Sequence, residues 1–478
     1  MTAAARQHHN LTLAILATVG TAFALQQTMV VPALPAFQRE LQTTTAWATW
    51  VLTVFLLVAS VATPLLGKLG DQYGKERLLL VSLTLFLAGC IGCAVAWSIG
   101  SLIAFRALAG AGAAVFPLSF AIIRDEFPRE KVGVAIGLVS AVFGVGGGFG
   151  IVFSGLIVDH LSWRWLFILG SVPIALCIPL VHRFVPESPI KTRTRVDFVG
   201  ATLLSLGLVA LLVALTEGVS WGWTSARVIA LFAAAAVVLA AWVLAELRVP
   251  EPMVDMHVFV HRPVLLTNVD ALITGFAMFG TFVLIPNFVE TPRDLPAAVH
   301  GLVHYGFGAS ATKAGLYLLP SSVTLLFAGP LAGLLGRRVG FKWPLAIGMF
   351  LAGASAASLA IWNEHPWQVL AAMPLLGVGV GFAFAAMATL ITESVRATET
   401  GIATGMNTVM RTVGGVVGGQ VGAGLLTSHL IHGSQVPAAR GYEIAFAIAA
   451  IAALVGAVVA VFVTPTGMRF VTAASQAR

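Results

Sequence analysis

Long hydrophobic stretches separated by short polar segments repeat along almost the whole chain. Each stretch holds about 20 residues with few charges, the length that an α-helix needs to cross a hydrocarbon core of roughly 30 Å. The pattern therefore predicts fourteen membrane-spanning helices, grouped as six, two and six. Their predicted ranges are 11–36, 45–67, 78–98, 101–123, 133–158 and 163–185; 197–216 and 226–246; and 263–289, 313–336, 341–362, 367–391, 401–428 and 442–464.

Composition agrees with this reading, because 58% of the 478 residues are hydrophobic and only 10% are charged. We predict an all-α polytopic membrane protein. The net charge of +7 is spread over short loops instead of one basic face, so we expect no nucleic-acid partner. Nineteen of the 27 Lys and Arg residues fall on one side of the predicted spans and six on the other. This bias predicts that both chain ends are cytoplasmic.

The segment 67–80, GKLGDQYGKERLLL, concentrates charge between two hydrophobic stretches. A related segment lies 266 residues further on, where PLAGLLGRRVGFK from Pro330 aligns with PLLGKLGDQYGK from Pro64. Each copy follows the second span of a six-span unit, an arrangement typical of secondary transporters. We therefore expect two six-helix halves, 1–185 and 263–478, with two inserted helices in 186–262.

The run G-K-L-G-D-Q-Y-G-K-E-R resembles the signature between the second and third helices of the major facilitator superfamily. With fourteen spans, the chain is similar to the drug:proton antiporter subfamily with fourteen helices. Further stretches that resemble the family are VVPALPAF (30–37), FRALAGAGAA (105–114), SWRWLF (162–167), GFGASATKAGLYLLP (306–320) and NTVMRTVGGVVGG (407–419). The resemblance implies the major facilitator fold and transport by alternating access.

The charged segment is expected to form a gating loop on the cytoplasmic side. Its glycines permit a tight turn and close helix approach. Asp71 can pair with a cation or face a helix N-terminus, and its basic neighbours can contact lipid headgroups or an acid. The alternative is that these charges only fix the topology. The expected gating residues are Gly67, Asp71, Gly74, Lys75 and Arg77, with Gly333 and Gly340 in the second copy.

Three ionisable residues lie well inside predicted spans, away from the span ends: Arg106, Asp270 and Arg411. A charge at the bilayer centre costs a few kcal/mol unless it faces water or a partner, so we expect all three to take part in proton coupling. The resemblance places Arg106 in a helix-four motif associated with proton transfer. A carboxylate beside an arginine can exchange its proton for a cationic substrate. A static ion pair between two helices is the alternative for Asp270 and Arg411.

Helical spacing places Asp270 on one polar face with Thr267, Thr274 and Thr281, a face that suits a water-filled cavity. The first span of the resembling family commonly carries an aspartate where this chain has Gln26 in LQQTMV. Glutamine cannot titrate, so a proton site must lie elsewhere, which strengthens the assignment of Asp270 to proton coupling. The residues expected to line a substrate cavity are Gln26, Gln27, Thr274, Met278 and Asn407.

We expect a secondary active exporter of amphipathic, drug-like compounds in exchange for protons, not an enzyme. The proton gradient supplies the energy, so no cofactor is expected, and histidine pairs without acidic or cysteine partners predict no metal site. Expected partners are small amphipathic molecules, protons and membrane lipids, and the expected state is a monomer in a bacterial inner membrane. The alternatives are transport of a lipid or a specific metabolite, which a lateral opening would favour, and a non-transporting receptor.

Overall fold

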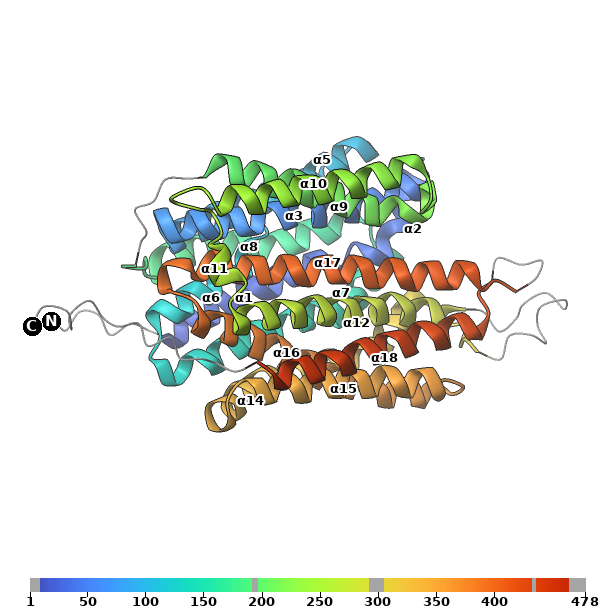
Figure 1. Cartoon of the computed structure of the whole chain (residues 1–478). Helices are drawn as coiled ribbons and strands as arrows, with labels where there is room; N and C mark the ends of the chain where they lie inside the picture. The colour runs from blue at the N-terminus through green and yellow to red at the C-terminus, as the bar shows by residue number, and fades with distance from the viewer. Residues whose placement is uncertain (1–8, 191–196, 292–304, 432–435, 464–478) are drawn as a thin grey trace, which may run out of the picture.

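The computed structural model describes residues 9–190, 197–291, 305–431 and 436–463. The basic link at 191–195 and both chain ends, which carry part of the predicted charge bias, lie outside these residues. Within the described chain, long helices lie side by side in one bundle (Figure 1). The described part of the chain is therefore all-α, as predicted.

The first part of the bundle comprises α1 (His9–Thr28), η1 (Val31–Ala33), α2 (Leu34–Glu40), α3 (Thr45–Tyr73), α4 (Lys75–Ala94), α5 (Ile99–Ala111), α6 (Val115–Glu126), α7 (Arg129–His160) and α8 (Arg164–Phe184). The predicted inserted helices are α9 (Phe198–Trp221) and α10 (Ala226–Glu246), followed by the short α11 (Met256–Phe259). The last part comprises α12 (Arg262–Glu290), α14 (Ala311–Val339), α15 (Lys342–Ile361), α16 (Pro366–Ser394), η2 (Ala397–Glu399), α17 (Thr400–Ser428) and α18 (Ala439–Val461).

Among the described residues, 12 helical segments are long and apolar enough to cross a membrane, so the protein is a multi-pass membrane protein. The glycine-rich helices α7 and α17, with 32 and 29 residues, occupy the positions of the other two predicted spans. The count of fourteen depends on these two helices and stays a prediction. The division into two halves and an insertion likewise stays a prediction.

Two predicted spans are broken. The first ends at Thr28 and the chain continues through η1 and α2, because Pro32 cannot donate a backbone hydrogen bond. The fourth divides into α5 and α6 around Gly112, whose backbone packs so closely that an added Cβ would lie 2.3 Å from the carbonyl oxygen of Ser82. Pro117 in the first turn of α6 also lacks the donor that would continue α5.

The predicted gating loop is almost entirely helical. Helix α3 runs six residues beyond the predicted span end to Tyr73, and α4 begins at Lys75. Only Gly74 separates them. Its φ of +126° is a backbone conformation that residues other than glycine rarely adopt. The second copy repeats this joint, since α14 ends before Gly340, which has φ +87°. The residues predicted to form the gate therefore lie at helix ends or, for Gly74 and Gly340, directly between helices.

Candidate functional site

The carboxylate of Asp71 lies against the first turn of α17. Its two oxygens accept hydrogen bonds from the backbone N–H groups of Gly401 and Ile402, each at 3.2 Å. These N–H groups have no partner within their own helix, and the helix dipole favours a negative charge at this position. Asp71 is fully buried. The end of α3 is thereby joined to a helix more than 300 residues away in sequence.

Lys75 and Arg124 extend this junction. The Lys75 ammonium lies 3.6 Å from Asp71, forms an ion pair with Asp125, and donates to the carbonyl oxygen of Ala397 at 3.3 Å. The Arg124 guanidinium donates to the carbonyl oxygens of Val395 and Arg396 and to the hydroxyl of Thr400. We call the cluster of Asp71, Lys75, Arg124 and Asp125 the inner latch. Its contacts connect the first part of the bundle to the segment between α16 and α17.

Sequence reasoning missed Arg124 and Asp125, because charges at the end of a span also serve as topology signals. It also missed Ser188, whose hydroxyl donates to Asp125 at 2.5 Å. Arg77 was expected to join the gate, but its side chain is 72% exposed and lies 3.8 Å from Glu187 at the rim. The latch is therefore built mainly from buried charges.

Glycines hold the two parts of the bundle together below the latch. A Cβ added to Gly67 would lie 2.4 Å from the carbonyl oxygen of Gly401, so α3 and α17 touch along their backbones. In the second copy, a Cβ on Gly333 would lie 2.6 Å from the carbonyl oxygen of Gly133, which brings α14 equally close to α7. The two copies of the repeat thus make equivalent helix contacts.

A cavity of about 40 Å³ lies between the two parts of the bundle, deeper than the latch. Ligand pockets usually have roughly 300–1,000 Å³, so this cavity is nearly closed in the structure. Its wall is mostly apolar and includes four phenylalanine rings, and Gln27 and Arg411 are its most polar members. Its lining comes from α1, α3, α6, α12 and α17 and includes Phe23, Gln27, Phe55, Phe116, Phe279, Thr408 and Arg411.

Of the five residues expected to line a substrate cavity, only Gln27 lines this one. Gln26 is fully buried and donates to the carbonyl oxygens of Leu166 and Phe167 on α8. A glutamine amide can satisfy these backbone groups, whereas the predicted cavity role would leave it in water. In the structure Gln26 therefore joins α1 to α8, and its place in a substrate cavity stays a prediction.

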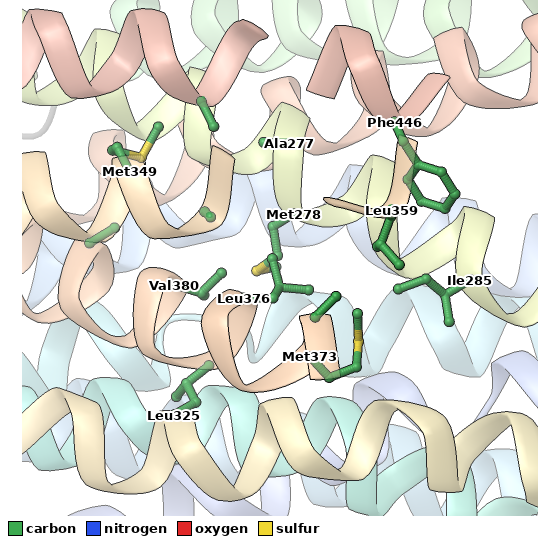
Figure 2. Close-up of a cluster of buried hydrophobic side chains, with 14 of the residues drawn as sticks. Ala277, Met278, Ile285, Leu325, Met349, Leu359, Met373, Leu376, Val380 and Phe446 are labelled. Atoms are coloured by element: carbon green, nitrogen blue, oxygen red, sulfur yellow. The ribbon is translucent and has the colours of Figure 1, made fainter. Parts of the chain in front are cut away.

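The other three expected cavity residues also lie elsewhere. Figure 2 shows Met278 in the apolar core with Met373 and Leu376 of α16. Thr274 donates to the backbone oxygen of Asp270, and Asn407 donates to the side-chain oxygen of Asn268 at 3.0 Å. Helical periodicity predicts the face on which a residue lies but not what the neighbouring helix presents to it.

Arg106 is 1% exposed, and its Nε donates to the carbonyl oxygen of Val51 at 3.2 Å. The guanidinium lies over the ring of Phe55, 4.2 Å from its centre, and Phe55 forms part of the cavity wall. Arg411 lines the cavity directly, and its guanidinium lies 4.4 Å from the centre of the Phe384 ring. Both cations are thus held next to aromatic faces, which attract positive charge.

Asp270 is fully buried, and neither carboxylate oxygen has a hydrogen-bond partner among the described residues. Asp270 therefore does not form the static ion pair with Arg411 that the sequence left as an alternative. Thr267, Thr274 and Thr281 are buried and donate to backbone oxygens of their own helix, so the water-filled face stays a prediction. Asp270 faces α18, where it approaches Gly456.

Comparison with known proteins agrees with this architecture. The family model described as Major Facilitator Superfamily matches residues 16–303 and 271–477. "Multidrug resistance protein 3" of Bacillus subtilis is 31% identical over 341 residues, 70% of this chain and 64% of that protein. "Tetracenomycin C resistance and export protein" of Streptomyces glaucescens is 27% identical over 385 residues, 80% of this chain and 69% of that protein.

The crystal structure of the human organic anion transporter MFSD10 (TETRAN) superposes with a TM-score of 0.66 at 13% identity, covering 95% of this chain and 100% of that one. This likeness concerns the fold alone. The chain spans less than two thirds of the length of the Bacillus relative, at 64%. Together, the family match over most of the chain, the glycine-ended repeat and the helical bundle show that the chain belongs to the Major Facilitator Superfamily.

Proposed function

We propose that the protein is a secondary active exporter that moves amphipathic, drug-like compounds out of the cell in exchange for protons. The observation that carries this proposal is the inner latch, which closes one end of the bundle through contacts between the two parts of the chain. Alternating access needs such a separable junction on each side of a central cavity. The named functions of the two bacterial relatives, in drug resistance and export, support this cargo class.

On this proposal, the intact latch means that the structure represents a state closed on the inside. Opening requires that Asp71 leave the N-terminus of α17 and that Arg124 leave its oxygen partners. Each of these groups can then bind water, so separation replaces hydrogen bonds instead of abolishing them. The small central cavity would enlarge as the two parts rotate apart.

Asp270 is the residue we assign to proton coupling. A buried carboxylate without partners carries a large desolvation cost, which a bound proton removes. Movement of α12 against α18 would change access to this carboxyl group. Arg411 and Arg106, which hold positive charge beside the cavity wall, are assigned an electrostatic role in the same step.

We further propose a monomer in the cytoplasmic membrane of a bacterium, with both termini inside. The latch end is then cytoplasmic, in agreement with the concentration of Lys and Arg in its connections. His9 at the start of α1 lies 3.0 Å from the carbonyl oxygen of Glu126, so the beginning of the first helix shares this end. The two six-helix halves and the inserted pair are the units that we expect to move.

A lipid cargo is the alternative that a specific observation favours. A pocket of about 280 Å³ lies at the side of the bundle, between α3, α9, α12 and α17. Its wall is mostly apolar and shares Leu56, Phe279 and Thr412 with the central cavity. A hydrophobic molecule could pass by this route between the bilayer and the cavity.

Ethidium flux in proteoliposomes under an imposed pH gradient tests the proposal. Wild-type protein should move ethidium along with the dissipation of the gradient, and Asp270→Asn should abolish this dependence because the amide cannot titrate. Glu443→Gln, which changes a half-buried carboxylate paired with Arg440 at the other end of the bundle, is the matched control. Gradient-driven flux that survives Asp270→Asn would remove Asp270 from the coupling step. Fluorescent lipid transfer without ethidium flux would favour the lipid cargo.

A further inference from the structure

The segment between α10 and α11 crosses the inner end of the bundle. We call residues 250–259, which also include α11, the inner strap. Its backbone is held at two points: Lys68 of α3 donates to the carbonyl oxygen of Pro252 at 3.1 Å, and Val254 donates to the Glu246 carboxylate at 3.1 Å. Met253 and Val254 are buried in one apolar cluster with Ile402 and Met406 of α17. The strap therefore joins the inserted helices to both sides of the latch.

A pocket of about 280 Å³ lies beneath the inner strap. This volume approaches the roughly 300 Å³ at which small-molecule sites begin. Its walls come from α3, the strap, α12, η2 and the start of α17, and it shares no lining residue with the central cavity. Apolar side chains, among them Met253, Phe259, Ile402 and Met406, form much of its surface.

Two polar groups of this pocket have atoms without partners in the described structure. Asn268, only 1% exposed, accepts a hydrogen bond through its oxygen, while its amide nitrogen Nδ2 has no acceptor. Glu399 has a buried carboxylate oxygen, Oε2, without a donor. Burial also raises the pKa of Glu399, because its charge has lost solvation. Buried polar atoms in proteins are almost always paired, so these two are available to hydrogen-bond a ligand that enters the pocket.

The charges of the lining indicate which ligand fits. Glu251, Asp255 and Glu399 face two cations, Lys68 and Arg396, which leaves one negative charge in excess. The Lys68 ammonium already donates to the strap, and Asp255 accepts from the backbone of His257. Glu399, whose Oε2 has no donor in the described structure, is available as the acceptor for an ammonium group, and Asn268 Nδ2 as the donor to a carbonyl or sulfonyl oxygen.

We propose that this pocket binds a small amphipathic amine, with its ammonium on Glu399, an oxygen acceptor on Asn268 and an apolar body against Met253 and Met406. Lys68 and Ile402 belong to α3 and α17, which part when the inner end opens. The complete site therefore exists only while the latch is closed. A ligand that binds only this state stabilises it, so the pocket is a regulatory site at which an amine holds the inner gate closed.

The test uses the full chain in lipid nanodiscs and a dansylated diaminopropane, which carries an ammonium group, sulfonyl oxygens and a naphthalene ring. Its fluorescence rise reports saturable binding, and the N-acetylated form is the uncharged control. Glu399→Gln keeps the size of the side chain and should weaken binding roughly tenfold or more, because a charge-assisted hydrogen bond is lost. Met253→Trp should fill the pocket and abolish binding, whereas Glu443→Gln should leave it unchanged.

Absence of saturable binding, or binding that survives both Glu399→Gln and Met253→Trp, would overturn the proposal. Unfolding midpoints of the variants identify any that fail to fold, and the isosteric Glu399→Gln keeps the test decisive. Binding needs no gradient, so it stands apart from the transport proposal: Asp270→Asn should bind the probe like wild type. The claim that the amine holds the inner gate closed rests on the proposed function, and flux tests it: the probe should inhibit ethidium flux in wild type, and Glu399→Gln should relieve this inhibition.

Discussion

Gly67→Ala adds a single carbon atom where α3 touches α17 at Gly401, and this contact is tight enough for the substitution to have a measurable effect on the proposed inner gate. A Cβ on Gly67 would lie 2.4 Å from the carbonyl oxygen of Gly401 and 2.7 Å from its carbonyl carbon. Ordinary contacts begin near 3.4 Å, so Gly67→Ala requires α3 and α17 to separate by about 1 Å. Alanine stabilises a helix relative to glycine by roughly 0.8–1.0 kcal/mol. Any loss of stability in Gly67→Ala therefore arises at the contact with α17 and not within α3.

Overpacking a tight contact costs about 1–3 kcal/mol. Because the clash exists only when the inner end is closed, this energy acts on the closed state alone. It should shift the ratio of closed to open molecules by roughly 5- to 150-fold. The hydrogen bonds of Asp71 to Gly401 and Ile402 lie one helical turn away, so a 1 Å separation would lengthen them as well.

Distances between spin labels at the inner end measure this shift. Cysteines at Arg77 and Arg396 place one label on each side of the latch, and both positions are exposed. The three native cysteines are buried, which disfavours their labelling. Gly67→Ala should move population to longer distances, whereas Gly424→Ala, where an added Cβ meets nothing within 4 Å, should not. An unchanged distance distribution in Gly67→Ala would refute the closed-gate reading of this contact.

Three further substitutions separate the roles of the site. Asp71→Asn removes the charge at the N-terminus of α17, worth about 0.3–2 kcal/mol, and should shift the same label distance in the same direction but less. Gln26→Ala removes two buried hydrogen bonds to α8, each worth about 0.5–1.5 kcal/mol, and should lower the free energy of unfolding by about 1–3 kcal/mol without changing ethidium affinity, since Gln26 does not line the cavity. Gly333→Ala, with its Cβ 2.6 Å from Gly133, should lower the unfolding midpoint but leave the inner label distance unchanged; a longer distance would contradict this.

The sequence predicts the bundle well because bilayer thickness dictates the length of each apolar stretch. It also predicts that Asp71 can face a cation or a helix N-terminus, and the structure shows both partners. The helical extension of α3 beyond its span could not be predicted from hydropathy. Charged residues end an apolar pattern, but here Asp71 and Lys75 neutralise each other inside the protein and the helix continues.

The site is predicted less well, because its geometry depends on the rotation of each helix against its neighbours. Asp270 and Arg411 are both buried inside the bundle, yet Arg411 lies over the ring of Phe384 while the Asp270 oxygens have no hydrogen-bond partner among the described residues. Gln26 and Gln27 show the same limit. They are adjacent in sequence, but one satisfies carbonyl oxygens of α8 while the other reaches the cavity. The glycine repeat was the most informative signal, because a residue with a Cβ would not fit where the two backbones touch.

The two copies of that repeat differ in a way that bears on how the gate opens. At the offset of 266, Asp71 corresponds to Arg337, which is exposed, and Lys75 corresponds to Phe341, which is buried against Gly133. The α3–α17 contact thus carries the charged latch, whereas the α7–α14 contact is sealed by an aromatic ring. Water can replace the partners of separated charges, but exposing apolar surface has no such compensation. The inner end should therefore open between α3 and α17 while α7 and α14 stay packed as the axis of the movement.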